Sequence, residues 1–372
     1  MRVAIPCVLA LLVLFAIGAG PCPAVELEVV AQLPVGPGNI TVTPDNRIII
    51  SLHPFYAPDN RVVELTRDKK LLPFPDPTWN SGDLRTDHSF DSVLGIQCDR
   101  KGVVWMLDNG LRSGSPPKLV GWDTSDNRLA RIIHLKPPAI PIQQIFPDNA
   151  FFNDLAVDLT HNAIYISHSA GIEDSALIVV DLKSGVARRI LQGHRSVTPE
   201  KTDVVMNGKA LNFTLPDAGR LRLLIGVNPI ALDSSDEWLY YGTMNGNVMY
   251  RIRTADLTNQ ELTNDQLGQR VERFSEKPVC DGISLDDAGN VYVSDLQANA
   301  IGVITKDGKY RKLVVDPRIS WPESFSFGPD GFLYFVASQL HLSGPLNEGV
   351  NRANPPFYVF RIKALAPGVV GR

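Results

Sequence analysis

Hydrophobic and polar residues alternate along this chain in a phrase that returns six times. Each copy has a short run with alternating apolar residues, a turn rich in Asp and Gly, and a second apolar run holding an aromatic residue. Alternation with a period of two places apolar side chains on one face of a strand, so each copy predicts two strands joined by a tight turn. The copies are NITVTPDNRIIISL, GIQCDRKGVVWMLD, NDLAVDLTHNAIYISH, NPIALDSSDEWLYYGT, DGISLDDAGNVYVSD and ESFSFGPDGFLYFVA.

The spacing of the copies predicts the fold. Equivalent positions lie roughly 40 to 75 residues apart, with further apolar runs between them. Repeats of this size with four strands each are typical of a β-propeller. The sixth copy is followed by one outer strand, FYVFRIK, and we expect LEVVAQL near the N-terminus to complete its sheet. The sequence therefore predicts an all-β, six-bladed β-propeller over residues 25–372, closed by pairing of N- and C-terminal strands. The equivalent positions are Ile40, Ile96, Leu155, Ile230, Ile283 and Phe325.

Two residue types recur inside the phrase, and for both we expect a structural role. An Asp stands where each of four turns begins, where its carboxylate can accept backbone N–H groups. A bulky aromatic residue follows on the second strand, where neighbouring sheets must pack. The Asp positions are Asp99, Asp158, Asp233 and Asp286, and the aromatic positions are Trp105, Tyr165, Tyr240, Tyr292 and Tyr334.

The N-terminus departs from the pattern. Residues 1–24 hold Arg2, a continuous apolar run and small residues, which is the pattern of a secretory signal peptide. An uncleaved membrane anchor is the alternative, but the run is short and lacks a cationic flank after it. We expect cleavage after Ala24, no stable membrane span afterwards, and a secreted, extracellular or periplasmic protein.

Charge and cysteine content narrow the functional classes. The net charge is −4, so no basic surface predicts nucleic-acid binding. Four cysteines are present, and Cys7 and Cys22 fall in the predicted signal peptide. Cys98 and Cys280 lie at non-equivalent places in the repeat, and we expect them to be buried thiols without a bridge.

The repeat also predicts a ring of polar residues. Each innermost strand of a propeller starts at one mouth of the axial channel, where we expect Asn39, Leu94 or Gly95, Asn153, Asn228, Asp281 and Glu323. The ring offers three amide and two carboxyl side chains, and oxygen ligands of this kind suit a hard cation such as Ca²⁺. The alternative is that each side chain only satisfies backbone groups at a strand start.

A second ring is expected where the next strand returns to the same mouth. It offers His53, Asp108, His168 and Asp295, besides Thr243 and Ala337. Beside a metal, a carboxylate can take a proton from water, and we expect Asp281 or Asp108 to act as this base. Asn39, His53, His168 and Asp295 are the expected contacts of a small molecule in the channel.

Several segments resemble the major royal jelly protein and yellow family. These are DSVLGIQCDRKGVVWMLDNG, NDLAVDLTHNAIYISHSAGIEDSALIVVDLKSGVARRI, NAIGVI, ISWPESFSFGPDGFLYFVAS and NRANPPFYVFRI. The resemblance spans most of the chain after residue 24 and implies a secreted six-bladed propeller associated with dopachrome conversion or small-ligand binding. The insect members look richer in disulfides than this chain.

A more distant resemblance, to the gluconolactonase and regucalcin family, bears on chemistry. Asn153 in FFNDLAVD, Asn228 in GVNPIAL and Asp281 in CDGISLD look like two Asn ligands and one Asp ligand of that family's divalent metal. The family's Asp is also its proposed base. The first-blade Glu of that family is not matched, because GPGNITV offers Asn39, and Glu323 is the candidate replacement.

These observations leave three functions open. The first is a metal-dependent hydrolase of a lactone or similar ester. The second is a propeller that binds a small ligand in its axial channel without chemistry. The third is an isomerase of the dopachrome-converting kind, and no set of residues in the sequence points to it. Fold alone does not choose among them.

Overall fold

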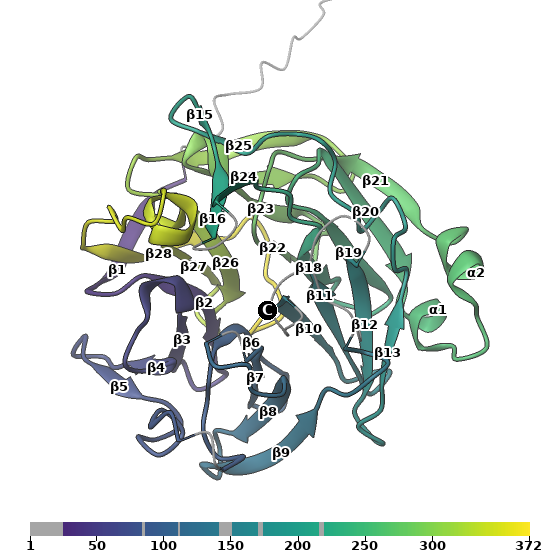
Figure 1. The fold of residues 1–372 in the computed structure, drawn as a ribbon, viewed down its shortest axis with the longest axis horizontal. Helices are drawn as coiled ribbons and strands as arrows, with labels where there is room; N and C mark the ends of the chain where they lie inside the picture. The colour runs from purple at the N-terminus through teal and green to yellow at the C-terminus, as the bar shows by residue number, and fades with distance from the viewer. Residues whose placement is uncertain (1–24, 84–85, 111, 141–150, 170–173, 216–218) are drawn as a thin grey trace, which may run out of the picture.

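The fold of the chain is a ring of six four-stranded antiparallel sheets (Figure 1). The computed structural model describes residues 25–372 except 84–85, 111, 141–150, 170–173 and 216–218. From axis to rim, the first blade is β2 (Pro37–Val42), β3 (Ile48–Leu52), β4 (Val62–Leu65) and β5 (Leu71–Pro73). The second blade is β6 (Val93–Cys98), β7 (Val103–Asp108), β8 (Lys118–Asp123) and β9 (Arg128–His134). The third blade is β10 (Phe152–Asp158), β11 (Ala163–His168), β12 (Ala176–Asp181) and β13 (Ala187–Ile190).

The other three blades follow in chain order. They are β18 (Val227–Leu232), β19 (Trp238–Thr243), β20 (Val248–Arg253), β21 (Glu272–Glu276); β22 (Ile283–Leu285), β23 (Val291–Asp295), β24 (Ala300–Ile304), β25 (Tyr310–Val315); and β26 (Pro322–Phe327), β27 (Phe332–Ala337), β28 (Phe357–Lys363), β1 (Leu27–Leu33). The predicted six-bladed propeller is therefore confirmed, with the expected outer strands in each blade.

The sixth blade closes the ring as predicted. Strand β1 pairs antiparallel with β28, so the start of the described chain supplies the outermost strand of the last sheet. Arg361 of β28 and Glu28 of β1 add an ion pair of 2.7 Å across this junction. Because both chain ends enter one sheet, the ring cannot open without breaking a complete strand pair.

Phe360 of β28 lies at the centre of this closing sheet. Its side chain is fully buried among Phe335, Ile362 and other residues of the sixth blade. We expect Phe360→Ala to lower the free energy of unfolding by about 3–5 kcal/mol, because truncation leaves a cavity in a packed core. Val29→Ala on β1, where the side chain is 41% exposed, should cost less than about 1 kcal/mol. Urea unfolding measures both, and equal effects would contradict the packing described.

The Asp and aromatic residues of the repeat form one recurring contact. Asp158 accepts from the backbone N–H of His161 and from the Tyr165 hydroxyl, both at 2.8 Å. Asp99 accepts from the indole N–H of Trp105 at 3.0 Å in the same way. Tyr165 packs against Ile230 of the next blade, and Trp105 against Leu155. The prediction that these Asp residues cap turns, and that the aromatics pack between neighbouring blades, is confirmed.

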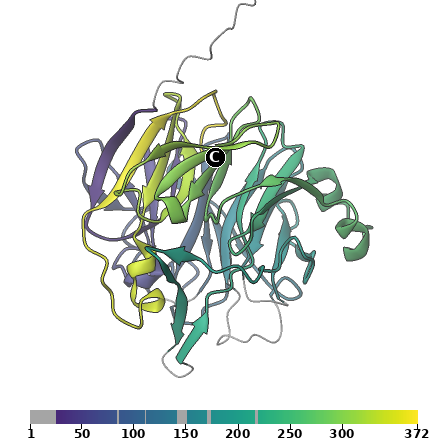
Figure 2. The same cartoon turned by 90° about the horizontal axis from the view of Figure 1, so that it is seen from above.

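Short additions decorate the faces of the ring. Two hairpins separate the third and fourth blades, and they project from one face (Figure 2). The hairpins are β14 (Val205–Met206) with β15 (Lys209–Ala210), and β16 (Asn212–Leu215) with β17 (Gly219–Arg222). The helical turns are η1 (Pro54–Tyr56), α1 (Thr254–Thr258), α2 (Asn264–Gly268), η2 (Leu296–Ala298), η3 (Leu340–Leu342) and η4 (Gly344–Leu346).

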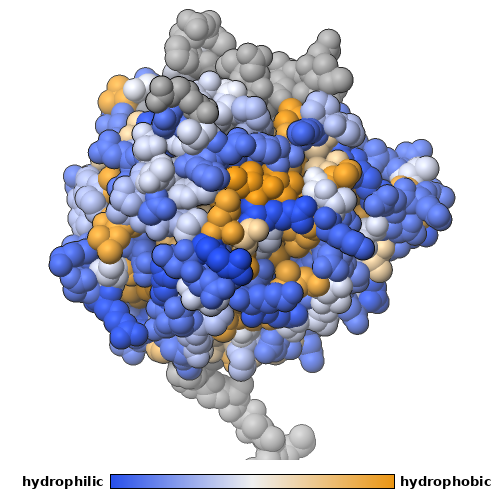
Figure 3. Space-filling model, turned by 90° about the horizontal axis from the view of Figure 1, so that it is seen from below, coloured by the Kyte–Doolittle hydropathy of each residue, from blue (hydrophilic) through white to orange (hydrophobic). Residues whose placement is uncertain are grey.

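The flank seen in Figure 3 is largely hydrophilic and carries an apolar patch near its centre. Among the described residues, none of the helices has the length and apolar character that crossing a bilayer requires.

Cys98 and Cys280 are buried free thiols, as predicted. The predicted signal peptide, residues 1–24, lies outside the described residues. Large exposed apolar residues belong to separate elements: Val29, Leu72, Val186, Leu221, Val315, Val350 and Leu365.

Candidate functional site

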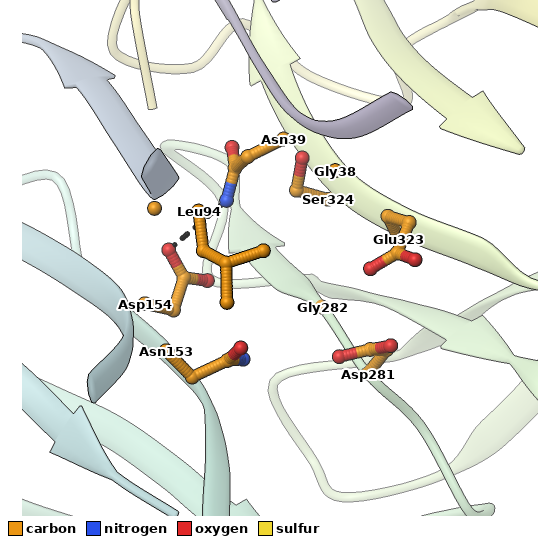
Figure 4. Close-up of a pocket in the computed structure, with 10 residues that line it drawn as sticks. Gly38, Asn39, Leu94, Asn153, Asp154, Asp281, Gly282, Glu323 and Ser324 are labelled. Carbon is orange, nitrogen blue, oxygen red and sulfur yellow. Dashed lines mark hydrogen bonds between the residues drawn. The ribbon is translucent and has the colours of Figure 1, made fainter. Parts of the chain in front are cut away.

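One polar pocket gathers the starts of the innermost strands (Figure 4). Its cavity volume is about 20 Å³, enough for on the order of one water molecule or ion, and no basic side chain belongs to the described lining. Asn228 reaches the same group through hydrogen bonds to Asn153 and Asp281. The structure thus brings all the predicted ring positions together. The lining residues are Gly38, Asn39, Leu94, Gly95, Asn153, Asp154, Asp281, Gly282, Glu323 and Ser324.

A β-bulge near the start of the innermost strand explains why two residues per blade reach the pocket. In the third blade Phe152 pairs with His168 and Leu155 with Ile166, so Asn153 and Asp154 face a single residue of β11. The register shifts at the same place in the first, second, fourth and sixth blades. A bulge turns the extra residue out of the ladder, and here both bulged residues lie at the axis.

Serines on the second strand stabilise these bulges. Ser167 accepts the backbone N–H of Asp154 at 3.0 Å, and Ser294 accepts that of Asp281 at 2.9 Å. Close approach of the blades requires glycine beside the acidic residues. A Cβ atom at Gly282 would lie 2.1 Å from the carbonyl oxygen of Glu323.

Asparagine side chains join the blades around the pocket. Asn153 donates from Nδ2 to Oδ1 of Asn228, and Asn228 donates from Nδ2 to Oδ1 of Asp281 at 2.5 Å. On the other side, Asn39 donates to Oδ1 of Asp154 at 3.1 Å (Figure 4). The ring is a connected set of amide and carboxyl groups from the first, third, fourth and fifth blades, with Glu323 added from the sixth.

The acidic side chains hold protons more strongly than usual. Burial raises the pKa of Asp281 to about 6, although hydrogen bonds from Trp321 and Asn228 lower it. Burial, and then the charge of Asp281, raise the pKa of Glu323 well above its ordinary value. Burial of the carboxyl group raises the pKa of Asp154 to about 7, with a further contribution from Asp281. Burial therefore disfavours the charged form of each of these three carboxyls, and a bound cation would offset that cost.

A sequence profile of the major royal jelly protein family matches residues 91–317, which is more than half of the chain. This chain belongs to the major royal jelly protein family. Major royal jelly protein 9 of Apis mellifera is 22% identical to it over 187 residues, covering 50% of this chain and 41% of that protein. The match therefore spans less than half of the length of this relative. The resemblance predicted from the sequence is confirmed.

Solved structures of other proteins share the propeller of this royal jelly family member. A gluconolactonase from Xanthomonas campestris superimposes with a TM-score of 0.56 at 11% identity, covering 91% of this chain and 89% of that one. A luciferin-regenerating enzyme gives 0.56 at 14% identity, covering 93% and 98%. Virginiamycin B lyase from Staphylococcus aureus gives 0.52 at 14% identity, covering 92% and 100%. At these identities the likeness establishes the fold alone.

The second predicted ring lies one step away from the pocket. Asp108 pairs with Val93 and His168 pairs with Phe152, each the residue that precedes a bulge. Asp108 is fully buried, and its oxygens accept the backbone N–H groups of Asp91 at 2.9 Å and Ser92 at 2.8 Å. It does not line the pocket, so the geometry argues against the expected role of Asp108 as a base.

The other members of the second ring are also used within the fold. His53 accepts the backbone N–H of Phe55 at 3.1 Å, and burial lowers the pKa of this histidine to about 3. Burial likewise lowers the pKa of His168 to about 3, and its Nδ1 lies 2.8 Å from the carbonyl oxygen of Asp174. Asp295 accepts the hydroxyl of Tyr310 at 2.5 Å. Of the predicted ligand contacts, Asn39 alone belongs to the described pocket lining.

Two site residues were missed by sequence reasoning. Asp154 follows the predicted Asn153 in the chain. Sequence reasoning took one position from each blade, so it did not include the second bulged residue. Trp321 precedes the sixth blade, and its indole N–H donates to Oδ2 of Asp281 at 2.8 Å. Trp321 is 1% exposed and has φ of 56°, a left-handed conformation that bulky residues rarely adopt. Strain of this kind next to Asp281 indicates that Trp321 positions that carboxylate.

Trp321→Phe tests this positioning. We expect the variant to lose about 1–2 kcal/mol of unfolding free energy, and also to weaken divalent-cation binding by about tenfold, because one hydrogen bond to a charged group is removed. Trp105→Phe is a matched control, since it removes a buried indole bond to Asp99 away from the pocket. The control should lose similar stability and keep the cation affinity. Unchanged cation affinity in Trp321→Phe would contradict the positioning role.

The donor set of the ring fits a hard divalent cation. Its polar groups are carboxyl and amide oxygens, which suit Ca²⁺. Among the described residues, no three His, Cys, Asp or Glu side chains are close enough to hold an ion by themselves. A cation here therefore needs the amide oxygens of Asn153 and Asn228 besides Asp281 and Glu323. Asn and carboxylate oxygens can be redirected by rotation of their side chains.

Proposed function

We propose that this royal jelly family propeller binds a divalent cation, Ca²⁺ in the simplest case, at its axial ring and hydrolyses a lactone or similar ester there. The observation that supports this most is the gathering of Asp154, Asp281 and Glu323 in one pocket without a basic side chain. Buried carboxyls in such a group must take up protons or a cation. Asn153, Asn228, Asp281 and Glu323 are the proposed ligands.

The chain's own residues supply the remaining chemistry. A bound cation would polarise the substrate carbonyl and make water more acidic. Asp281, ionised near neutral pH and held by the Trp321 indole, is the proposed base. Asp154, with a pKa of about 7, is a second carboxyl that can exchange a proton near neutral pH. Asn39 bonds to Asp154 and fixes its orientation.

A panel of γ-lactones, δ-lactones and aryl esters tests the hydrolase. We expect hydrolysis with Ca²⁺ that is lost after chelation with EDTA and restored by added Ca²⁺. Asp281→Ala should remove this activity, while Asp158→Asn, in a distant turn, should retain it. Activity that is indifferent to chelation, or the absence of any cation binding, would exclude this proposal.

Non-catalytic binding of a small ligand is the second proposal. An apolar cluster next to the ring favours it: Trp321, which bonds to Asp281, packs with Met206, Met244 and Leu340. Phe55 and Phe213 pack against the cluster from outside and remain partly exposed. Such side chains suit an aromatic or apolar ligand above the polar ring. Cation binding without turnover of any ester would favour this function.

The site of action is proposed to lie outside the cytoplasm, in an extracellular or periplasmic space. The support is the signal-peptide pattern of residues 1–24. Sequencing the N-terminus of the exported protein tests it. We expect the mature chain to begin at Val25, and a retained Met1 would contradict the proposal.

A further inference from the structure

Residues 367–372 cross the axis at the end of the channel opposite the ring (Figure 1, where C marks the chain end). Val370 forms a parallel bridge with Phe327, and Gly368 forms an antiparallel bridge with Asp286. The backbone N–H of Phe327 donates to the carbonyl oxygen of Arg372 at 2.7 Å. The segment is thereby fastened to the fifth and sixth blades at the far ends of their inner strands.

The same segment contacts the other four blades. The Thr41 hydroxyl of the first blade donates to the carbonyl oxygen of Gly371 at 2.9 Å. Gly371 also packs on the second blade, because a Cβ atom there would lie 2.3 Å from the carbonyl oxygen of Cys98. Arg372 donates to the carbonyl oxygens of Val157 in the third blade and Asp233 in the fourth, both at 2.9 Å.

A buried ion pair holds the side chain of Arg372. Its Nη2 lies 2.5 Å from Oδ1 of Asp236, and the two side chains are 8% and 0% exposed. The other oxygen of Asp236 accepts from Arg100 at 3.1 Å and from Thr160 at 2.6 Å. Loss of one partner would leave a buried charge unpaired, which is strongly destabilising. The ion pair therefore holds residues 367–372 in place.

A cavity lies between this segment and the ring. It has a cavity volume of about 20 Å³, and its lining includes Arg372 as well as the ring residues Asn39, Asp154 and Ser324. We propose that residues 367–372 are a plug that closes the far end of the axial channel and ties the six blades together. Ligand and solvent then exchange through the ring mouth, whether or not the ring holds a cation.

Cys98 provides a reporter for the plug because it is fully buried where Gly371 packs. Deleting residues 367–372 should make Cys98 react with an aromatic disulfide reagent at least about tenfold faster, because its cover is removed. Cys280, buried beside the ring, should keep its slow rate. Peptide mapping by mass spectrometry identifies the labelled thiol. An unreactive Cys98 in the folded deletion variant, or equal acceleration of both thiols, would overturn the plug.

Arg372→Met provides a milder variant for the case that the deletion fails to fold. We expect it to lower Tm by roughly 5–10 °C and to accelerate Cys98 labelling, because the ion pair with Asp236 is lost. Arg361→Met is the control, since it removes ion pairs to Glu28 and Asp330 at the rim of the sixth blade. The control should change Tm without exposing Cys98. Labelling of Cys98 in both variants alike would contradict the proposal.

Discussion

Asp281→Asn is expected to abolish the stabilisation that we expect Ca²⁺ to give this protein, while changing the stability of the metal-free protein little. The wild-type ring holds Asp154, Asp281 and Glu323 together, and burial raises the pKa of each carboxyl. Asn keeps the shape of Asp281 and removes one buried charge, and this gain offsets the hydrogen bond that its Nδ2 cannot accept from Asn228 or Trp321. A proposed ligand is lost while the stability of the fold changes little.

Thermal melting measures both effects. At a Ca²⁺ concentration of about 100 times Kd, the wild type should gain about 2.7 kcal/mol, and Asp281→Asn should gain none. Asp286→Asn is the control, because Asp286 caps the turn of the same blade and bonds to Tyr292. It should lose stability and still respond to Ca²⁺. A full Ca²⁺ response in Asp281→Asn would show that the cation binds elsewhere.

Acid should weaken cation binding strongly. Cation and protons compete for the same oxygens, and the pKa values of Asp281 and Asp154 are raised to about 6 and about 7. We expect Ca²⁺ affinity to fall at least about 100-fold from pH 8 to pH 5, because carboxylates must be deprotonated to act as ligands. Calorimetric titrations at several pH values measure this change.

The metal-free protein should show the opposite trend in stability. A carboxyl whose pKa is raised by folding binds more protons in the folded state than in the unfolded state. Its contribution is therefore fully present below the ordinary Asp pKa of 3.8 and is lost as pH rises through the folded pKa values of about 6 and about 7. Asp154→Asn should flatten the pH dependence of both the Ca²⁺ affinity and the metal-free stability near pH 7. Profiles identical to those of the wild type would contradict the assignment of Asp154.

The sequence predicted the architecture because blade formation is a local property. Alternation around Ile283 and Leu285, a turn at Asp286 and an aromatic at Tyr292 define a strand pair without knowledge of the rest of the chain. Closure by β1 followed from counting strands, since the sixth blade lacked one. The repeat also predicted which residues start each inner strand, so it located most of the polar ring.

The rest of the site depends on features that a repeat alignment does not contain. Asp154 reaches the pocket because the inner strand bulges, which depends on pairing across two strands. The second ring was predicted at equivalent positions of the repeat. In the fold, however, Asp108 accepts backbone hydrogen bonds, and burial lowers the pKa of His53, so both residues serve the fold. Trp321 and the plug of residues 367–372 lie outside the repeated phrase, and only the folded chain brings them to the axis.

Titration of the chelator-treated wild type with Ca²⁺ at pH 7.5, measured by isothermal titration calorimetry, tests the central claim most directly. Five of the six blades aim amide and carboxyl oxygens at one point, and this predicts a single ion per chain with a Kd of about 10 µM or tighter, comparable with oxygen-ligand sites of similar charge. An absence of binding heat, or binding that Asp281→Asn does not weaken, would contradict the account.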